Sequence, residues 1–207
     1  MARVSAAKVQ ETKTNLLEAA RQVLVERGYE GLTTRAVAGV AGAPMSQIQY
    51  HFGSKEGLIT ALFVTMDGEL RQRQEAMFSD SNLTLSQQWD QACDYLEQDL
   101  ASGYVRVLHE LMAASLANAK IRAIVRDGMM AWFQVLRDVA EKFERTYPLQ
   151  SPFEAYDLSA LVGAAFVGAE AYLLLGMEEA GVPVRRALRR VGDMIRSAEL
   201  QSSRRES

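Results

Sequence analysis

Residues 33–58 read TTRAVAGVAGAPMSQIQYHFGSKEGL, and this stretch decides the fold of the N-terminal part of the chain. Its pattern predicts two short helices, over residues 34–41 and 44–51, separated by a break that contains Gly42. Glycine suits this break because the residue that follows a helix often needs a positive φ, and Pro44 suits the first turn of the next helix. Two short helices joined by such a turn form a helix-turn-helix, whose second helix fits the major groove of DNA.

Helical periodicity continues through the rest of the chain, and no segment alternates with period two. We therefore expect an all-α fold of about nine helices: an N-terminal three-helix helix-turn-helix domain followed by a C-terminal helical bundle. The other seven helices are expected over about residues 8–27, 55–78, 84–100, 104–118, 120–146, 153–177 and 184–199. Gly28 lies just past the first helix, Thr33 and Ser54 are N-cap candidates, and breaks fall at residues 148–152 and 181–183.

A polar break at residues 79–82 is the expected domain boundary. Residues 1–55 are then a DNA-binding domain, and the helix over about 55–78 connects it to the remainder. Residues 80–200 are expected to form a ligand-binding and dimerisation domain. The last segment, 201–207, is expected to be a disordered tail.

The charge is distributed unevenly along the chain. Residues 1–55 hold seven Lys or Arg and four acids, a net charge of +3, so the remainder of a chain with net charge −3 carries −6. A basic N-terminal part on an acidic body favours phosphate binding at one end only. The single cysteine, Cys93, is typical of a reducing compartment, and the N-terminus lacks the apolar segment of a signal peptide. We therefore expect a cytoplasmic protein.

Residues 12–63 resemble the N-terminal domain of the TetR family of transcriptional regulators, most strongly at Tyr50-His51-Phe52, Ser54-Lys55-Glu56 and Leu58. The resemblance implies a homodimeric, ligand-responsive regulator, a repressor that a small effector releases from a pseudo-palindromic operator in double-stranded DNA. Four residues depart from the family's usual pattern, namely Ala36, Pro44, Gln47 and Gln49. The last two alter the surface offered to the bases, so the operator sequence of relatives cannot be transferred to this chain.

Side chains of the second short helix are candidates for base contacts, because glutamine can pair with both N6 and N7 of adenine. These candidates are Met45, Ser46, Gln47 and Gln49. Helix N-termini favour phosphate, and the family resemblance implies phosphate contacts at Thr33, Thr34, Arg35, Tyr50, His51 and Lys55. The alternative is an exposed helix surface without a partner, or, for His51, a structural role at the helix end.

Residues 158–177 form a mostly apolar run of 20 residues. Its length allows a membrane span, but the charge of Glu170 at mid-bilayer would cost at least ~2.5 kcal/mol, so we expect a buried helix and no membrane partner. Small residues four apart make a smooth ridge, which together with an apolar stripe in the last helix predicts the dimer interface. These residues are Ala160, Ala164, Gly168, Val184, Leu188, Val191 and Ile195.

Aromatic residues and methionines scattered through the C-terminal helices predict a site for a mainly apolar small molecule between helices. The candidates are Trp89, Tyr95, His109, Met112, Met129, Trp132, Phe166 and Glu170. The alternative for the apolar members and for His109 is a place in the core. For Glu170, which needs a partner if buried, the alternative to an effector is an internal arginine such as Arg106 or Arg137.

The sequence gives no positive support for an enzyme, since it contains no GxSxG, P-loop, HExxH or GxGxxG motif. With two histidines and one cysteine, a zinc site is not expected either, and no cofactor is expected. An all-α enzyme that uses Glu170 or His109 and a membrane-associated protein are the two disfavoured alternatives.

Overall fold

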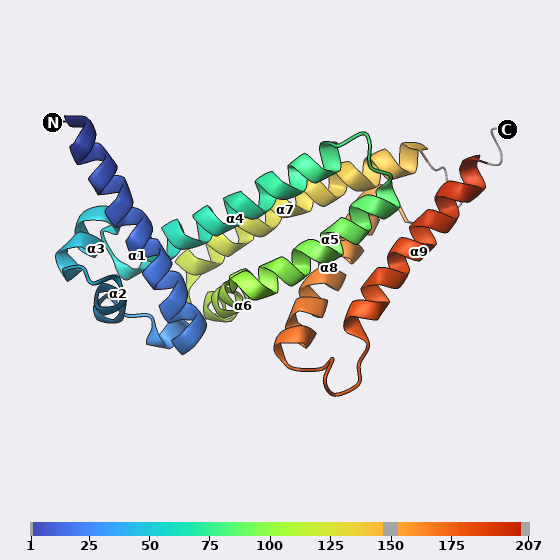
Figure 1. Cartoon of the computed structure of the whole chain (residues 1–207). Coiled ribbons are helices and arrows are strands. Elements are labelled where there is room, and N and C mark those ends of the chain that lie inside the picture. Colours follow the sequence, from blue (N-terminus) through green and yellow to red (C-terminus); the bar gives the residue numbers. More distant parts are fainter. Residues whose placement is uncertain (1, 147–152, 204–207) are drawn as a thin grey trace. The chain divides into compact units, whose positions relative to one another are not determined.

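The structure is a computed structural model that describes residues 2–146 and 153–203 (Figure 1). Within these ranges the regular structure is entirely helical, which confirms the predicted all-α fold. The helices are α1 (Ala2–Gly31), α2 (Thr34–Ala41), α3 (Met45–Phe52), α4 (Lys55–Ser79), α5 (Leu85–Ser102), α6 (Tyr104–Ser115), α7 (Ala119–Thr146), α8 (Ala155–Leu174) and α9 (Val184–Ser203). The predicted break at residues 148–152 lies outside the described residues.

Two compact units divide the chain. The N-terminal unit comprises Met1–Gly68 and Gly103–Gly128, and the C-terminal unit comprises Glu69–Ser102 and Met129–Ser207. This division differs from the expected boundary at residues 79–82, which lies inside the C-terminal unit. The reason is that α6 packs on α1: a Cβ atom added to Gly103 would lie 2.8 Å from Cγ2 of Val25.

The first helix begins earlier than predicted and is broken where predicted. α1 starts at Ala2, and Gly28 interrupts it with φ 68° and ψ −178°, a conformation that is essentially restricted to glycine. The predicted apolar face is confirmed, because its four members are fully buried: Leu16, Ala20, Val23 and Leu24.

Local capping explains the bounds of α2, α3 and α4. The Thr33 hydroxyl accepts a hydrogen bond from the Ala36 amide at 3.1 Å, and Gly42 ends α2 in the left-handed region with φ 60°. Pro44 precedes α3 as its N-cap and makes no side-chain cap bond. Ser54 caps α4, since its hydroxyl accepts from the Gly57 amide at 3.0 Å. The predicted helix-turn-helix is therefore present with its bounds shifted by one residue or less.

In the C-terminal unit, α9 lies beside α5 (Figure 1). Two ion pairs of normal length join these helices, Arg185 to Glu97 at 2.7 Å and Arg196 to Asp90 at 2.8 Å, and Arg189 pairs with Asp94 between them. α9 continues to Ser203, so the expected disordered tail from residue 201 is helical over its first three residues. Residues 204–207 lie outside the described part.

Candidate nucleic-acid interface and effector region

The outer face of α3 carries most of the predicted base-reading side chains. Met45, Ser46 and Gln49 are exposed, whereas Ile48 is 1% exposed. Gln47 is half-buried. α3 is therefore anchored through one apolar side chain and presents a thioether, a hydroxyl and an amide outward, groups suited to base edges and thymine methyls.

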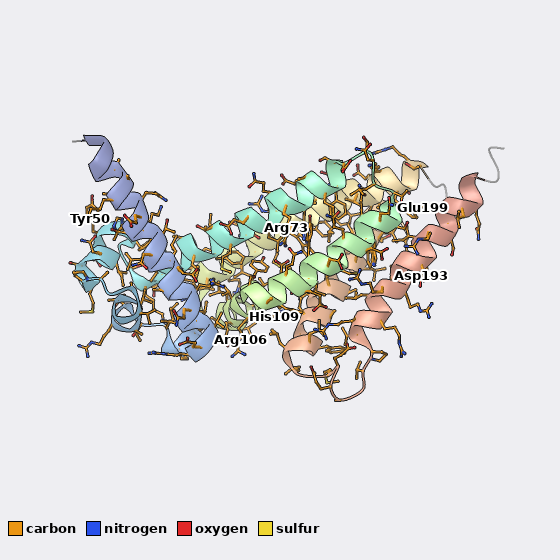
Figure 2. All side chains as sticks on the ribbon, viewed as in Figure 1. Tyr50, Arg73, Arg106, His109, Asp193 and Glu199 are labelled. Carbon is orange, nitrogen blue, oxygen red and sulfur yellow. The ribbon has the colours of Figure 1, made fainter. Side chains whose placement is uncertain are left out.

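Predicted phosphate-contacting residues lie at both ends of the α2–α3 motif. Thr33 and Arg35 are exposed at the start of α2, and Thr34 is half-buried. At the end of α3, Tyr50, labelled in Figure 2, is 73% exposed. Its ring meets the half-buried His51 edge-on at a centroid distance of 4.9 Å.

The N-termini of α2, α3 and α4 differ in the charge of their first turns. The first turns of α2 and α3 contain no acidic residue, so their free N–H groups and positive dipole ends are open to an anion. The first turn of α4 contains Glu56, and hydrogen bonds from the backbone N–H and from Ser54 lower the pKa of this carboxyl. The N-termini of α2 and α3 are therefore more favourable to an anion than that of α4.

Lys55 contacts the end of α1. Its ammonium donates to the Tyr29 carbonyl oxygen at 3.2 Å and lies 4.6 Å from the centroid of the Tyr29 ring. An ammonium has three donors, so this hydrogen bond leaves two for a phosphate. No pattern in the sequence indicates the contact between Tyr29 and Lys55, because two helices separate the two residues along the chain.

Some of the residues predicted to hold an effector come together in the C-terminal unit. The rings of Trp89 and Phe166 pack edge to face with centroids 5.5 Å apart. Trp132 lies against Gly163, whose added Cβ would sit 3.5 Å from the indole. Met129, Trp132 and Glu170 are half-buried.

The other predicted pocket residues have different surroundings. His109 and Met112 are half-buried and belong to the N-terminal unit, whereas the remaining candidates belong to the C-terminal unit. Tyr95 lies under the Arg73 guanidinium at 4.2 Å, and its hydroxyl accepts from Gln91 at 3.2 Å.

The arginines proposed as internal partners of Glu170 are engaged with other acids. Arg106 pairs with Glu110 at 3.0 Å, and Arg137 pairs with Glu141 at 2.9 Å. Each pair is spaced i, i+4 on one helix, a spacing that the sequence could have revealed.

An internal ion pair that the sequence did not reveal joins α4 to α5. Arg73 donates from one terminal nitrogen to both oxygens of the 9%-exposed Asp99, each at 2.8 Å. Burial raises the pKa of Asp99 despite this partner. Next to the pair, the Arg73 Nε and the Gln74 Oε1 are buried without a hydrogen-bond partner. A donor and an acceptor in the C-terminal unit are thus unsatisfied, which is costly unless another molecule meets them.

The small-residue ridge of α8 lies on its outer side within the C-terminal unit. Ala160 and Ala164 are exposed, and a Cβ added to Gly168 would meet no atom within 4 Å. α8 is long and apolar enough to cross a membrane by length and composition alone, and only 17% of that stretch is buried in the chain's described part. The buried helix expected from the sequence is therefore largely open in the single chain.

Of the four apolar residues predicted for the dimer interface on α9, two are buried in the C-terminal unit and two are half-buried. Val184 and Leu188 are 6% and 8% exposed and belong to its core, because α9 turns this face toward α5. Val191 and Ile195 are half-buried. The large apolar side chains that α9 exposes are instead Met194 and Leu200, which are 72% and 60% exposed.

The described residues contain no group of three or more His, Cys, Asp or Glu side chains placed to hold a metal ion. The lone cysteine, Cys93, is buried in the C-terminal unit. Burial raises the pKa of its thiol to about 11.

Comparison with known proteins identifies the N-terminal domain. Residues 16–62 match the family model of bacterial regulatory proteins of the tetR family. The chain is similar to the transcriptional repressor AcnR of Corynebacterium glutamicum, with 41% identity over 51 residues that cover 25% of this chain and 27% of that protein. It is also similar to the transcriptional regulator UidR of Escherichia coli, with 25% identity over 145 residues, 65% of this chain and 69% of that protein. The match to the first of these relatives thus spans about a quarter of that relative's length.

Solved structures share the fold over nearly the whole chain. The transcriptional regulator FadR of Bacillus subtilis in complex with stearoyl-CoA has a TM-score of 0.72 and 14% identity, covering 88% of this chain and 96% of that one. A regulator from Saccharomonospora viridis in complex with choline has a TM-score of 0.70 and 20% identity, covering 86% and 94%. These similarities extend the shared fold into the C-terminal helices.

Proposed function

The chain belongs to the TetR family of bacterial regulatory proteins, and from this premise we propose that it is a ligand-responsive, sequence-specific DNA-binding regulator that represses transcription. The observation that carries the proposal is the division of α3 into a buried face, at Ile48, and an outward face, at Met45, Ser46 and Gln49. Such a helix after a tight turn reads bases from the major groove. Gln47, half-buried beside them, completes the proposed reading set.

Phosphate contacts position α3 on the duplex. The acid-free N-termini of α2 and α3, with Thr33, Thr34 and Arg35 beside them, supply N–H groups, hydroxyls and a guanidinium. Tyr50, His51 and Lys55 supply the contacts at the far end of α3. These groups fix the orientation and carry no sequence information by themselves.

The proposed partner of the chain is a second copy. The open ridge of Ala160, Ala164 and Gly168 lets another backbone approach closely, and the exposed Met194 adds apolar area on α9. The half-buried Val191 and Ile195 lie at the edge of this proposed surface. The buried Val184 and Leu188 belong to the core beneath it. Two-fold symmetry then places two copies of α3 on a pseudo-palindrome with half-sites about one helical turn apart.

The proposed effector binds inside the C-terminal unit. Trp89, Met129, Trp132 and Phe166 offer apolar surface. A mainly apolar molecule fits such a lining. The stearoyl-CoA and choline complexes of similar structures support small-molecule binding as a class. The chain acts in the cytoplasm and catalyses no reaction under this proposal.

A selection from random duplex DNA tests the central claim. The purified chain should enrich a pseudo-palindrome, and the enriched site should be bound more tightly than its scrambled version. Binding without any sequence preference would contradict the proposal. A thermal-shift screen of small molecules should then identify ligands that weaken operator binding, and operator DNA must weaken ligand binding by the same factor. Tight ligands that leave operator affinity unchanged would contradict the allosteric part alone.

A further inference from the structure

Glu110 of α6 meets α1 at the point where that helix is broken. Its Oε2 accepts a hydrogen bond from the Tyr29 amide, the first amide after Gly28, at 3.0 Å. Its Oε1 accepts from Arg106 Nε at 3.1 Å and pairs with Arg106 Nη2 at 3.0 Å. Both carboxylate oxygens therefore accept hydrogen bonds. Arg106, labelled in Figure 2, holds the carboxylate in place.

The contact between Glu110 and the α1 break is close. A Cβ atom at Gly28 would lie 3.2 Å and 3.4 Å from the two carboxylate oxygens, so the absence of a side chain at residue 28 lets the carboxylate approach. The positive φ of Gly28 makes the same demand for glycine. Both the backbone conformation of residue 28 and the space that the Glu110 carboxylate occupies therefore favour glycine at the break.

Tyr29 also contacts Lys55, which lies just after the end of α3. The residue that gives its N–H to Glu110 gives its carbonyl oxygen to Lys55 at 3.2 Å and its ring to the Lys55 ammonium at 4.6 Å. Lys55 begins α4, directly after the Gly53-Ser54 turn that ends α3. One residue of α1 therefore links a carboxylate of α6 to a cation beside α3, all within the N-terminal unit.

We propose that Glu110 is a positioning residue for DNA binding: through the Tyr29 backbone it holds Lys55 where its remaining donors meet an operator phosphate. This inference rests on the proposed function. An acid has no favourable direct contact with a polyanion, and its charge alone opposes DNA binding. Position and charge therefore predict effects of opposite sign, which makes the role of Glu110 testable.

Substitutions at residue 110 separate the two effects. Glu110→Asp keeps the charge but shortens the side chain by one methylene, and it should weaken binding to the selected operator about tenfold because the Tyr29 amide loses its partner. Glu110→Gln keeps an acceptor of full length and should stay within about threefold of wild type. Asp127→Asn is the matched charge control, since Asp127 is 74% exposed in the same unit and its ion pair with Arg126 spans 3.6 Å.

A double-mutant cycle with Lys55→Ala tests the route. In the Lys55→Ala background the tenfold effect of Glu110→Asp should fall below about threefold, because coupled residues are not additive. A purely structural role of Glu110 would instead lower affinity equally in both backgrounds, and that result would overturn the inference. Operator binding by Glu110→Asp equal to that of wild type would also overturn it and would leave the proposed function intact. A wild-type chain without sequence preference would overturn both.

Discussion

Trp89 of α5 donates its indole N–H to the carbonyl oxygen of Leu188 in α9 at 2.8 Å. The N–H group of this proposed pocket residue is thus already satisfied within the C-terminal unit. Leu188, which the sequence predicts as a dimer contact, lies instead in this contact between α5 and α9 and is 8% exposed. The pair therefore fixes α9 on α5, and an effector can use the face of the Trp89 ring but not its donor.

Trp89→Phe keeps an aromatic ring and removes the donor to Leu188. We expect a loss of about 1 kcal/mol in the free energy of unfolding, the net value of one hydrogen bond, plus the effect of a smaller ring. Urea unfolding followed by circular dichroism measures it. Trp132→Phe is the matched substitution, because Trp132 packs its ring against Gly163. A larger loss at residue 132 than at residue 89 would count against the importance of the Trp89–Leu188 bond.

Gly168→Leu should split the proposed dimer without unfolding the chain. A Cβ at Gly168 meets no atom of the described residues within 4 Å, so we expect the added side chain to obstruct the proposed partner rather than its own chain. Sedimentation should show a monomer, and operator binding should fall with the loss of the second half-site. Gly163→Leu is the contrasting variant: its Cβ would lie 3.4 Å from Leu136 and 3.5 Å from Trp132, so it should lower the melting temperature. A stable dimer formed by Gly168→Leu would move the interface elsewhere.

Gln49→Ala should change the sequence preference of the chain. Gln49 is exposed on α3, and loss of a bidentate contact to adenine costs ~1–3 kcal/mol at one base pair. Titration of the selected operator and of its single-base variants would locate that position. Gln22→Ala provides the control, since its amide bonds Glu26 on α1 at 2.9 Å. An unchanged base preference in Gln49→Ala would remove Gln49 from the reading set, and the same titration with Gln47→Ala tests its half-buried neighbour.

Cys93 should be inert in the folded chain. With a thiol pKa of about 11, roughly one molecule in a thousand is thiolate at pH 8, and the side chain is 4% exposed. Iodoacetamide at pH 8 should therefore leave the native chain unmodified while alkylating it fully in urea. Mass spectrometry gives an unambiguous answer because the sequence contains one cysteine. Rapid alkylation of the native chain would show that the C-terminal unit opens around Cys93.

The sequence by itself determined what lies within a few residues along the chain. Gly42 ends α2 with the predicted positive φ, Thr33 and Ser54 cap the helices they were expected to cap, and α1 breaks at Gly28. Helix capping, turn geometry and the 3.6-residue period are local, so the residue types alone report them. The helix-turn-helix and its match to the TetR family follow from such local signals.

Tertiary structure alone decided which residues from distant segments meet. Leu188 and Met194 are both apolar residues of α9, yet Leu188 is buried and Met194 is exposed, because packing against α5 selects the face. Arg73 hydrogen-bonds Asp99, which is 26 residues away along the chain, and the Tyr29 amide hydrogen-bonds Glu110, which is 81 residues away. No periodicity encodes such pairs, since they depend on how helices cross after each has formed. Because Glu110 reaches Lys55 only through the Tyr29 backbone, this link to the proposed DNA-contacting lysine became visible in the folded chain alone.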